Sequence, residues 1–146
     1  MQKEKVFVTR RIPEKGLVIL RKESSVEIWQ GDMPPTQSEL LKKVAGTAGI
    51  LSLLTDKIDA TVMDAAGSGL KVISNYAVGY DNIDIPEATR RGIAVGNTPG
   101  VLTEATADLT FALLMAAARR VAEGDRQVRA GGSQARSWFW DESPVL

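Results

Sequence analysis

The sequence predicts an α/β fold in which five parallel strands form a doubly wound sheet in the order 2-1-3-4-5. Two observations lead to this prediction. Short apolar runs alternate with helical patterns along the first 100 residues, and most of these runs lack the in–out alternation of a half-exposed strand. Strands of a parallel sheet have this character because crossover helices cover both faces. Five such units predict a flavodoxin-like domain, followed by a long C-terminal helix and an irregular tail.

The five expected strands are the short apolar runs at residues 6–9, 26–29, 49–54, 70–74 and 93–96. Helices between them are indicated by their start signals. Pro13 suits the first turn of a helix that continues through Leu20. Thr36 and Glu39 match a capping box, and Asp84 is an N-cap residue with Pro and Glu in the following turn. A further helix is expected over residues 59–66, and helix ends are expected at Gly46, Gly67 and Gly92.

The C-terminal third is expected to differ from the rest. Thr103 is predicted to cap the longest helix, from Glu104 to about Ala122, which is apolar nearly all round. Such a helix is expected to be buried in the core, or alternatively to pack against a second domain or subunit. The predicted organisation is therefore a domain over residues 1–100, an interdomain or dimer helix over 101–123 and an arm over 124–146, where Trp138 and Trp140 need a surface to cover.

Composition excludes several classes of function. Lys+Arg and Asp+Glu both number 18, so the net charge of zero gives no reason to expect nucleic acid or an anionic membrane surface as partner. No apolar run approaches the roughly 20 residues of a membrane span. Cysteine is absent, which favours a cytoplasmic protein. Histidine is also absent, so acid–base or metal chemistry that uses imidazole is excluded for these residues acting alone.

The candidate binding residues follow from the expected topology, because ligands of doubly wound sheets bind outside the carboxyl ends of the strands. The turn Ala77-Val78-Gly79 follows the fourth strand, and its successive N–H groups can form a concavity for a carboxylate or phosphate. Asn75 adds a neutral amide beside it. The alternative is that Gly79 only turns the chain. The segment Gly67-Ser68-Gly69 fails the dinucleotide fingerprint and is expected to be a helix stop and turn, and no metal-ligand cluster is apparent.

Several segments together closely resemble the D-isomer-specific 2-hydroxyacid dehydrogenases, especially their glyoxylate and hydroxypyruvate reductase branch. The segments are GYDNIDIPEATRRGIAVGNTPGVLTEATADLTFALLMAAARR (residues 79–120), LLTDKID (53–59), LKVISNYAVG (70–79) and RQVRAGG (126–132). The resemblance spans essentially the whole chain. It implies a flavodoxin-like substrate domain, a small 2-keto or 2-hydroxy acid as ligand, and NAD or NADP as cofactor of the complete enzyme.

The resemblance also implies roles for individual residues. The N–H groups of Val78 and Gly79 are expected to bind the substrate carboxylate. Further pocket positions are Asn75 and Ala77, with Leu54 and Thr55 as the other wall. Thr106 is expected to approach the cofactor, and residues 103–140 are expected to form a homodimer contact.

The sequence departs from the family pattern where the chemistry would be completed. The nucleotide-binding domain with its G-x-G-x-x-G fingerprint, and the catalytic Arg, Glu and His, are not present in these 146 residues. We therefore expect a truncated substrate-binding part that binds no cofactor and has no activity alone. The alternative is a non-enzymatic binding or assembly module that dimerises through its long helix. A receiver or flavin module on the same fold is disfavoured because Thr9-Arg10-Arg11 replaces the acidic or phosphate-binding residues that those proteins need.

Overall fold

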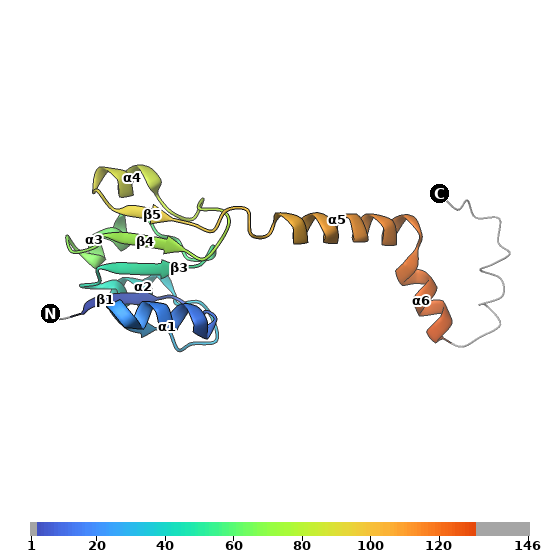
Figure 1. The fold of residues 1–146 in the computed structure, drawn as a ribbon, viewed down its shortest axis with the longest axis horizontal. Coiled ribbons are helices and arrows are strands. Elements are labelled where there is room, and N and C mark those ends of the chain that lie inside the picture. Colours follow the sequence, from blue (N-terminus) through green and yellow to red (C-terminus); the bar gives the residue numbers. More distant parts are fainter. Residues whose placement is uncertain (1–2, 131–146) are drawn as a thin grey trace. The chain divides into compact units, whose positions relative to one another are not determined.

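The computed structural model describes residues 3–130 and divides the chain into two compact units, Met1–Val101 and Leu102–Leu146. The first unit contains a parallel sheet whose strands are β1 (Glu4–Val8), β2 (Ser24–Ile28), β3 (Gly49–Ser52), β4 (Val72–Asn75) and β5 (Ala94–Gly96). The strand order is β2-β1-β3-β4-β5 and every neighbouring pair is parallel. The predicted fold class and strand order are confirmed (Figure 1).

Four helices connect these strands: α1 (Glu14–Glu23), α2 (Gln37–Val44), α3 (Ala60–Ala66) and α4 (Ile85–Arg90). Their predicted start signals are observed. The Thr36 side chain accepts from the N–H of Glu39 while the Glu39 carboxylate accepts from the N–H of Thr36, which completes a capping box. Asp84 accepts from the N–H of Glu87 at 3.0 Å. Gly92 has a φ of 70°, a left-handed conformation that favours glycine after a helix.

The core of the first unit has two parts, one on each face of the sheet. The larger part packs side chains of β1, β3 and β4 against α2, α3 and α4, with Phe7 and Ile73 fully buried at its centre. The smaller part packs β1 against α1 through Val8 and Leu17. Burying each side chain of this size contributes about 1.5–3 kcal/mol, so the layered core holds the carboxyl ends of the strands in fixed positions.

The second unit contains two helices, α5 (Thr103–Ala118) and α6 (Val121–Arg129), where the sequence predicts one helix from Glu104 to about Ala122. The chain changes direction at Arg120, which adopts a left-handed conformation with φ 50° and ψ 35°. The N-cap is Leu102 without a side-chain cap, so the prediction that Thr103 caps this helix is wrong. The expectation that the chain is irregular after Gly124 is wrong as far as Arg129, because these residues belong to α6.

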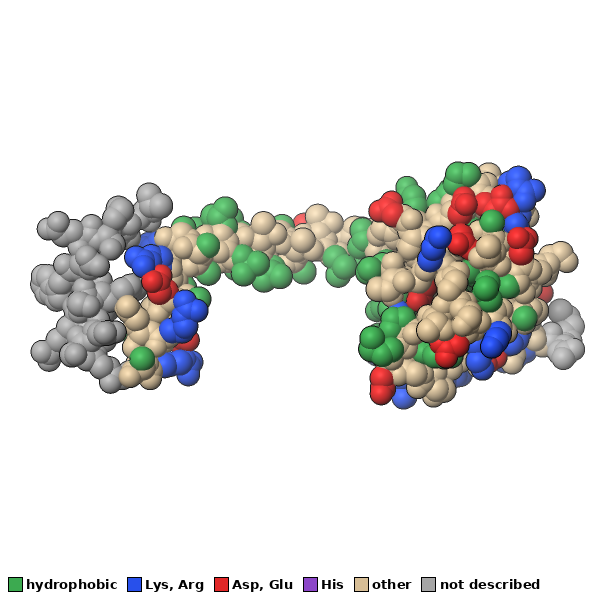
Figure 2. All heavy atoms as spheres, turned by 180° about the vertical axis from the view of Figure 1, so that it is seen from behind, with side chains coloured by type: hydrophobic (Ala, Val, Ile, Leu, Met, Phe, Trp, Pro, Cys, Tyr) green, Lys and Arg blue, Asp and Glu red, His purple; other side chains and the backbone are tan. Residues whose placement is uncertain are grey.

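Helix α5 is not a core helix within the described residues, because none of its residues is buried. Its large apolar side chains are largely solvent-exposed: Phe111 has a relative exposure of 67% and Leu109 of 60%. Figure 2 shows hydrophobic side chains distributed along α5. Trp138 and Trp140, which were expected to belong to an arm, lie outside the described residues. No helix among residues 3–130 is long and apolar enough to cross a membrane.

Candidate functional site

The segments that follow β3 and β4 lie side by side at the carboxyl edge of the sheet. Ser52 and Asn75 are paired in the strand register, and the N–H of Tyr76 donates to the Ser52 carbonyl at 2.7 Å. The pairing therefore continues one residue beyond β4 and fixes where the two loops begin. The loop after β3 contains Leu54 and Thr55, and the loop after β4 runs from Tyr76 to Gly79, so the predicted topology brings both predicted walls together.

The turn at Ala77, Val78 and Gly79 has an uneven distribution of hydrogen bonds. The carbonyl of Ala77 accepts from the N–H of Thr98 at 2.9 Å. The carbonyls of Val78 and Gly79 accept from side-chain amides, at 2.7 Å from Asn97 Nδ2 and at 2.9 Å from Asn75 Nδ2. Within residues 3–130, no hydrogen bond is donated by the N–H groups of these three turn residues. In this part of the chain all three acceptors are occupied while all three donors are free.

This distribution suits a small anion. The successive free N–H groups carry partial positive charge. The carbonyl oxygens of the same residues already accept hydrogen bonds from other donors. Val78 is 40% exposed, so a ligand can reach this part of the turn, while Ala77 is buried at 9% exposure. No group of acidic residues that could hold a metal ion occurs in the described part of the chain. The free donors of this turn are thus neutral peptide N–H groups.

Two asparagine side chains connect the turn to the loop after β3. Asn75 is 1% exposed, and its Nδ2 donates to the Gly79 carbonyl and to Asn82 Oδ1, both at 2.9 Å. Its Oδ1 accepts from the Ser52 hydroxyl at 2.9 Å. Asn82 Nδ2 donates to the carbonyls of Leu53 at 3.1 Å and Asp56 at 2.9 Å. Each amide thus satisfies its polar atoms and joins two segments that are far apart in the sequence.

The loop after β3 is held on its other side by a buried carboxylate. Asp56 is 4% exposed and accepts from the Thr9 hydroxyl at 2.5 Å and from the Leu53 N–H at 2.8 Å. Arg10 pairs with the same carboxylate at 3.2 Å and donates to the Thr55 hydroxyl at 2.5 Å. A buried carboxylate needs such partners because an unpaired buried charge is costly.

Arg10 retains an unused donor at this position. Its Nη1 is buried and has no hydrogen-bond partner in the part of the chain that the structure describes. Because the other terminal nitrogen already bonds Thr55 and Asp56, the guanidinium is committed to the loop after β3. No catalytic role is expected for Arg10 from the sequence, and its contacts are those of a residue that holds this loop in place.

The predicted site residues therefore occupy different environments. Leu54 is 66% exposed at the edge of the sheet, Thr55 is tied to Arg10, and Asn75 is buried behind the turn. Thr106 lies in α5, in the second unit, and its approach to a cofactor stays a prediction. Sequence reasoning missed Asn82 and Asp56, and no local pattern identifies their partners. Only their position beside a predicted binding turn could have indicated them.

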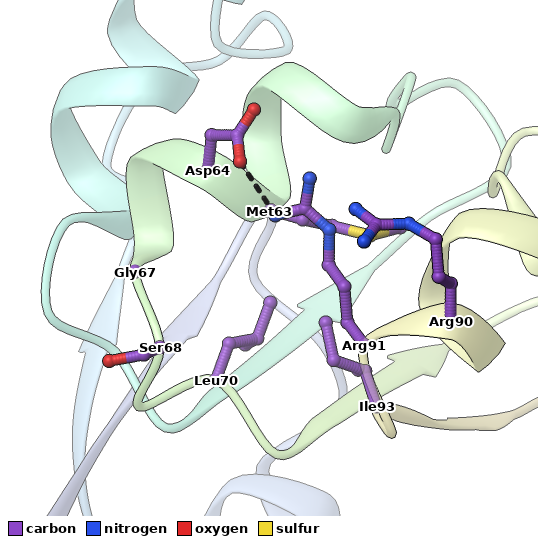
Figure 3. A pocket seen from close by; sticks show the side chains of 8 residues that line it. All are labelled: Met63, Asp64, Gly67, Ser68, Leu70, Arg90, Arg91 and Ile93. Carbon is purple, nitrogen blue, oxygen red and sulfur yellow. Dashed lines mark hydrogen bonds and ion pairs between the residues drawn. The ribbon is translucent and has the colours of Figure 1, made fainter.

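A pocket lies at the opposite, amino edge of the sheet. It has a volume of about 460 Å³ and is lined by residues of α3 and α4 and by residues that precede β4 and β5. Figure 3 shows Arg90 and Arg91 reaching into it. Arg91 donates to Asp64 at 2.7 Å and both arginines pair with Glu87. Both arginines therefore lie away from the carboxyl edge, and Arg91 links α4 to α3.

The described residues do not fit a dinucleotide. Its pyrophosphate binds at a glycine-rich turn between a strand and the N-terminus of a helix. In this structure the turn between β1 and α1 contains Arg10 and Ile12, and α1 begins after Pro13 with no side-chain cap. Gly67 and Gly69 lie between α3 and β4, where they end a helix and enter a strand.

The fold and the turn define a doubly wound α/β domain with a site suited to a small anion at its carboxyl edge. The family model of the D-isomer specific 2-hydroxyacid dehydrogenase catalytic domain matches residues 6–136. The chain belongs to this family.

The similar proteins are reductases whose chains are longer. The chain is 55% identical over 129 residues to a glyoxylate reductase of Korarchaeum cryptofilum, a match that covers 88% of this chain and 39% of the relative. It is 51% identical over 138 residues to a glyoxylate reductase of Pyrococcus horikoshii, covering 94% and 41%. The chain therefore spans about 40% of the length of these relatives.

Solved structures agree with the fold. A crystal structure of a protein from Thermus thermophilus matches with a TM-score of 0.79 and 53% identity, covering 87% of this chain and 40% of the other. An NADPH-dependent glyoxylate/hydroxypyruvate reductase of Sinorhizobium meliloti, solved in complex with NADP and malonate, matches with a TM-score of 0.67 and 26% identity. That match covers 99% of this chain and 42% of the reductase.

Proposed function

We propose that this chain is the substrate-binding part of an NAD(P)-dependent D-2-hydroxyacid dehydrogenase that reduces a small 2-keto acid such as glyoxylate or hydroxypyruvate. The observation that carries the proposal is the turn at residues 77–79, where within the described residues the carbonyls are all occupied and the N–H groups are all free. Identity of about 50% to glyoxylate reductases supports the substrate class. The malonate in the Sinorhizobium meliloti complex supports a carboxylate ligand.

The carboxylate of the keto acid binds the N–H groups of Val78 and Gly79, beside Ala77. Leu54 and Thr55 form the opposite wall and exclude water from the keto carbon, while Asn75 holds the turn from behind. Two charge-assisted hydrogen bonds of about 1.5–3 kcal/mol each are offset by a cost of association of about 4 kcal/mol or more. The net free energy of binding is then at most about −2 kcal/mol, so we expect a dissociation constant of about 30 mM or higher for a keto acid, since about 1 mM corresponds to about −4 kcal/mol.

Reduction of the keto group requires more than this site supplies. Hydride transfer from a nicotinamide needs a proton donor at the developing alkoxide and a cation that orients the carboxylate. These 146 residues contain no histidine. Arg10 at the carboxyl edge and Arg90 and Arg91 at the opposite edge are engaged with carboxylates. The chain alone is therefore proposed to bind substrate without turning it over. In the complete enzyme, NAD or NADP would supply the hydride and Thr106 would lie near it.

The experiment that tests this function is a titration followed by amide resonances. Uniformly 15N-labelled chain is titrated with glyoxylate and with hydroxypyruvate, and chemical shifts of Val78 and Gly79 are recorded. The expected result is saturable shifts at these amides with a dissociation constant of about 30 mM or higher, and no oxidation of NADH or NADPH. Absence of saturable shifts at this turn would contradict the substrate-binding role, and steady turnover by the pure chain would contradict the inactive state.

A second candidate function, a non-enzymatic assembly module, is favoured by α5. A helix that exposes Leu109, Phe111 and Leu114 at 59–67% presents more apolar surface than an isolated helix tolerates in water. We propose that residues 103–140 form a homodimer contact, which is compatible with either function. Sedimentation analysis of the wild-type chain and of Phe111→Ser tests whether this homodimer contact forms. The expected result is a dimer that the substitution weakens, and a wild-type monomer at high concentration would exclude the contact.

A further inference from the structure

Two loops from neighbouring strands form the walls of the proposed pocket, and one side chain lies between them. Asn82 Nδ2 has two hydrogens, which are donated to the carbonyls of Leu53 at 3.1 Å and Asp56 at 2.9 Å. Its Oδ1 accepts from Asn75 Nδ2 at 2.9 Å. Asn82 follows the turn at residues 77–79 in the chain and contacts the loop after β3 in space. It therefore bridges both walls through hydrogen bonds alone.

The bridge continues to the turn itself. The second hydrogen of Asn75 Nδ2 is donated to the Gly79 carbonyl, and Asn75 Oδ1 accepts from the Ser52 hydroxyl. The orientation of the Gly79 carbonyl therefore depends on an amide whose own rotamer is set by Asn82. Because hydrogen-bond networks with every member satisfied restrict side-chain rotation, removing one amide leaves the others free to turn.

The same side chain also fixes the position of the second wall. The carbonyls of Leu53 and Asp56 flank Leu54 and Thr55, so their bonds to Asn82 hold both ends of this short segment. Asp56 fixes the segment from the other side through Thr9 and Arg10. Without the Asn82 side chain, the loop after β3 keeps its anchor to Thr9 and Arg10, and the backbone pairing of Ile58 with residues 82–84 also remains. The loop loses the two bonds that hold the Leu53 and Asp56 carbonyls.

We propose that Asn82 is a positioning residue that sets the spacing between the two walls of the carboxylate site. This inference rests on the proposed function. Asn82 does not touch the substrate. It acts through Asn75 on the Gly79 peptide and through two carbonyls on Leu54 and Thr55. Its removal therefore increases the mobility of residues 77–79 and weakens carboxylate binding, even where the sheet stays folded.

The test compares Asn82→Ala with the matched control Thr47→Ala. Thr47 is fully buried, donates from its hydroxyl to the Val44 carbonyl at 2.7 Å, and precedes β3 at the opposite edge of the sheet. Both variants therefore remove side-chain hydrogen bonds to backbone carbonyls. Two quantities are measured on the 146-residue chain: the 15N relaxation of the Val78 and Gly79 amides without ligand, and the dissociation constant for glyoxylate.

The expected result is that Asn82→Ala increases the mobility of the two amides and raises the dissociation constant at least about tenfold, while Thr47→Ala changes neither. Unchanged mobility in folded Asn82→Ala overturns the inference, and so does unchanged affinity when the wild-type chain binds. If the wild-type chain binds no keto acid, the proposed function fails and the relaxation of the ligand-free turn alone decides the inference.

A second variant covers the case in which Asn82→Ala does not fold. Ser52→Ala removes only the hydroxyl that donates to Asn75 Oδ1. It leaves Asn75 less restricted, so the same two quantities are expected to change in the same direction by a smaller factor. Folded Ser52→Ala with the mobility and affinity of the wild-type chain contradicts the proposed network.

Discussion

Asn75→Asp is expected to destabilise the first unit by about 3–5 kcal/mol. The substitution keeps the shape of a side chain that is 1% exposed, but replaces its NH2 group by oxygen. Two buried hydrogen bonds, to Gly79 and Asn82, are lost at about 1 kcal/mol each. The new oxygen then faces these two acceptors without a donor, which adds about 1–3 kcal/mol.

The control for this prediction is Asn97→Asp, in the segment that follows β5. Asn97 makes the equivalent contact to the neighbouring carbonyl, Nδ2 to Val78 at 2.7 Å, but the bond is exposed. Water can replace the lost donor there, so we expect Asn97→Asp to lower the free energy of unfolding by about 0.5–1 kcal/mol. Urea unfolding followed by amide resonances of β3 and β4 measures both variants, because these probes report the first unit alone.

The dependence on pH provides a further check of the same prediction. Burial among acceptors raises the pKa of the introduced carboxyl above that of the unfolded chain, about 3.9. The part of the destabilisation that comes from the charge is then absent below the unfolded pKa and grows as the pH rises from the unfolded to the folded pKa. A smaller cost remains at low pH, because a protonated carboxyl can donate to only one of the two acceptors. A cost for Asn75→Asp no larger than that of Asn97→Asp at pH 7 would refute this account of Asn75. A deficit that does not shrink toward pH 4 would refute it as well.

Three further outcomes are expected. Thr36→Ala removes the capping box of α2 and should lower the free energy of unfolding by about 1 kcal/mol in a urea titration, whereas Gln37→Ala should have little effect. Phe7→Ala removes a fully buried side chain and should lower the free energy of unfolding by about 3–5 kcal/mol. The control Val18→Ala, at a position that is 47% exposed, should lower it by less than about 0.5 kcal/mol. Hydrogen bonds from Arg90, the larger cause, and from Arg91 lower the pKa of Glu87 from 4.5 to about 2. The contribution of the Glu87 carboxylate to the free energy of unfolding is therefore fully present above about pH 4.5 and is lost as the pH falls toward 2. An NMR titration that finds the Glu87 carboxyl titrating near 4.5 would show that these pairs are absent in solution.

Most of the first unit could be predicted because its signals are local. Apolar runs, the capping box at Thr36 and the N-cap at Asp84 each specify an element within a few residues, and right-handed crossover connections then leave few possible strand orders. The observed strand order agrees with the predicted one. The turn at Gly79 could be located by the same reasoning, because the carboxyl end of each parallel strand falls at one edge.

The errors have equally specific causes. The helix break at Arg120 requires a positive φ, and the sequence has neither glycine nor asparagine at that position to signal it. The partners of Asn82 lie 26–29 residues away in the sequence, so periodicity cannot reveal them. The exposure of α5 could not be inferred either, because an apolar helix has the same pattern whether its partner lies in the same chain or in another.

The anion site proposed at Ala77, Val78 and Gly79 selects for the sign of a ligand's charge without using an ionisable group. Its carbonyl oxygens already accept hydrogen bonds from Thr98, Asn97 and Asn75, whereas its N–H groups donate none among the described residues, so the turn favours an anion over a cation. Peptide N–H groups do not titrate near neutral pH. Recognition by this turn is therefore insensitive to the protonation of the protein, and any pH dependence of a reaction at this edge must originate in other residues.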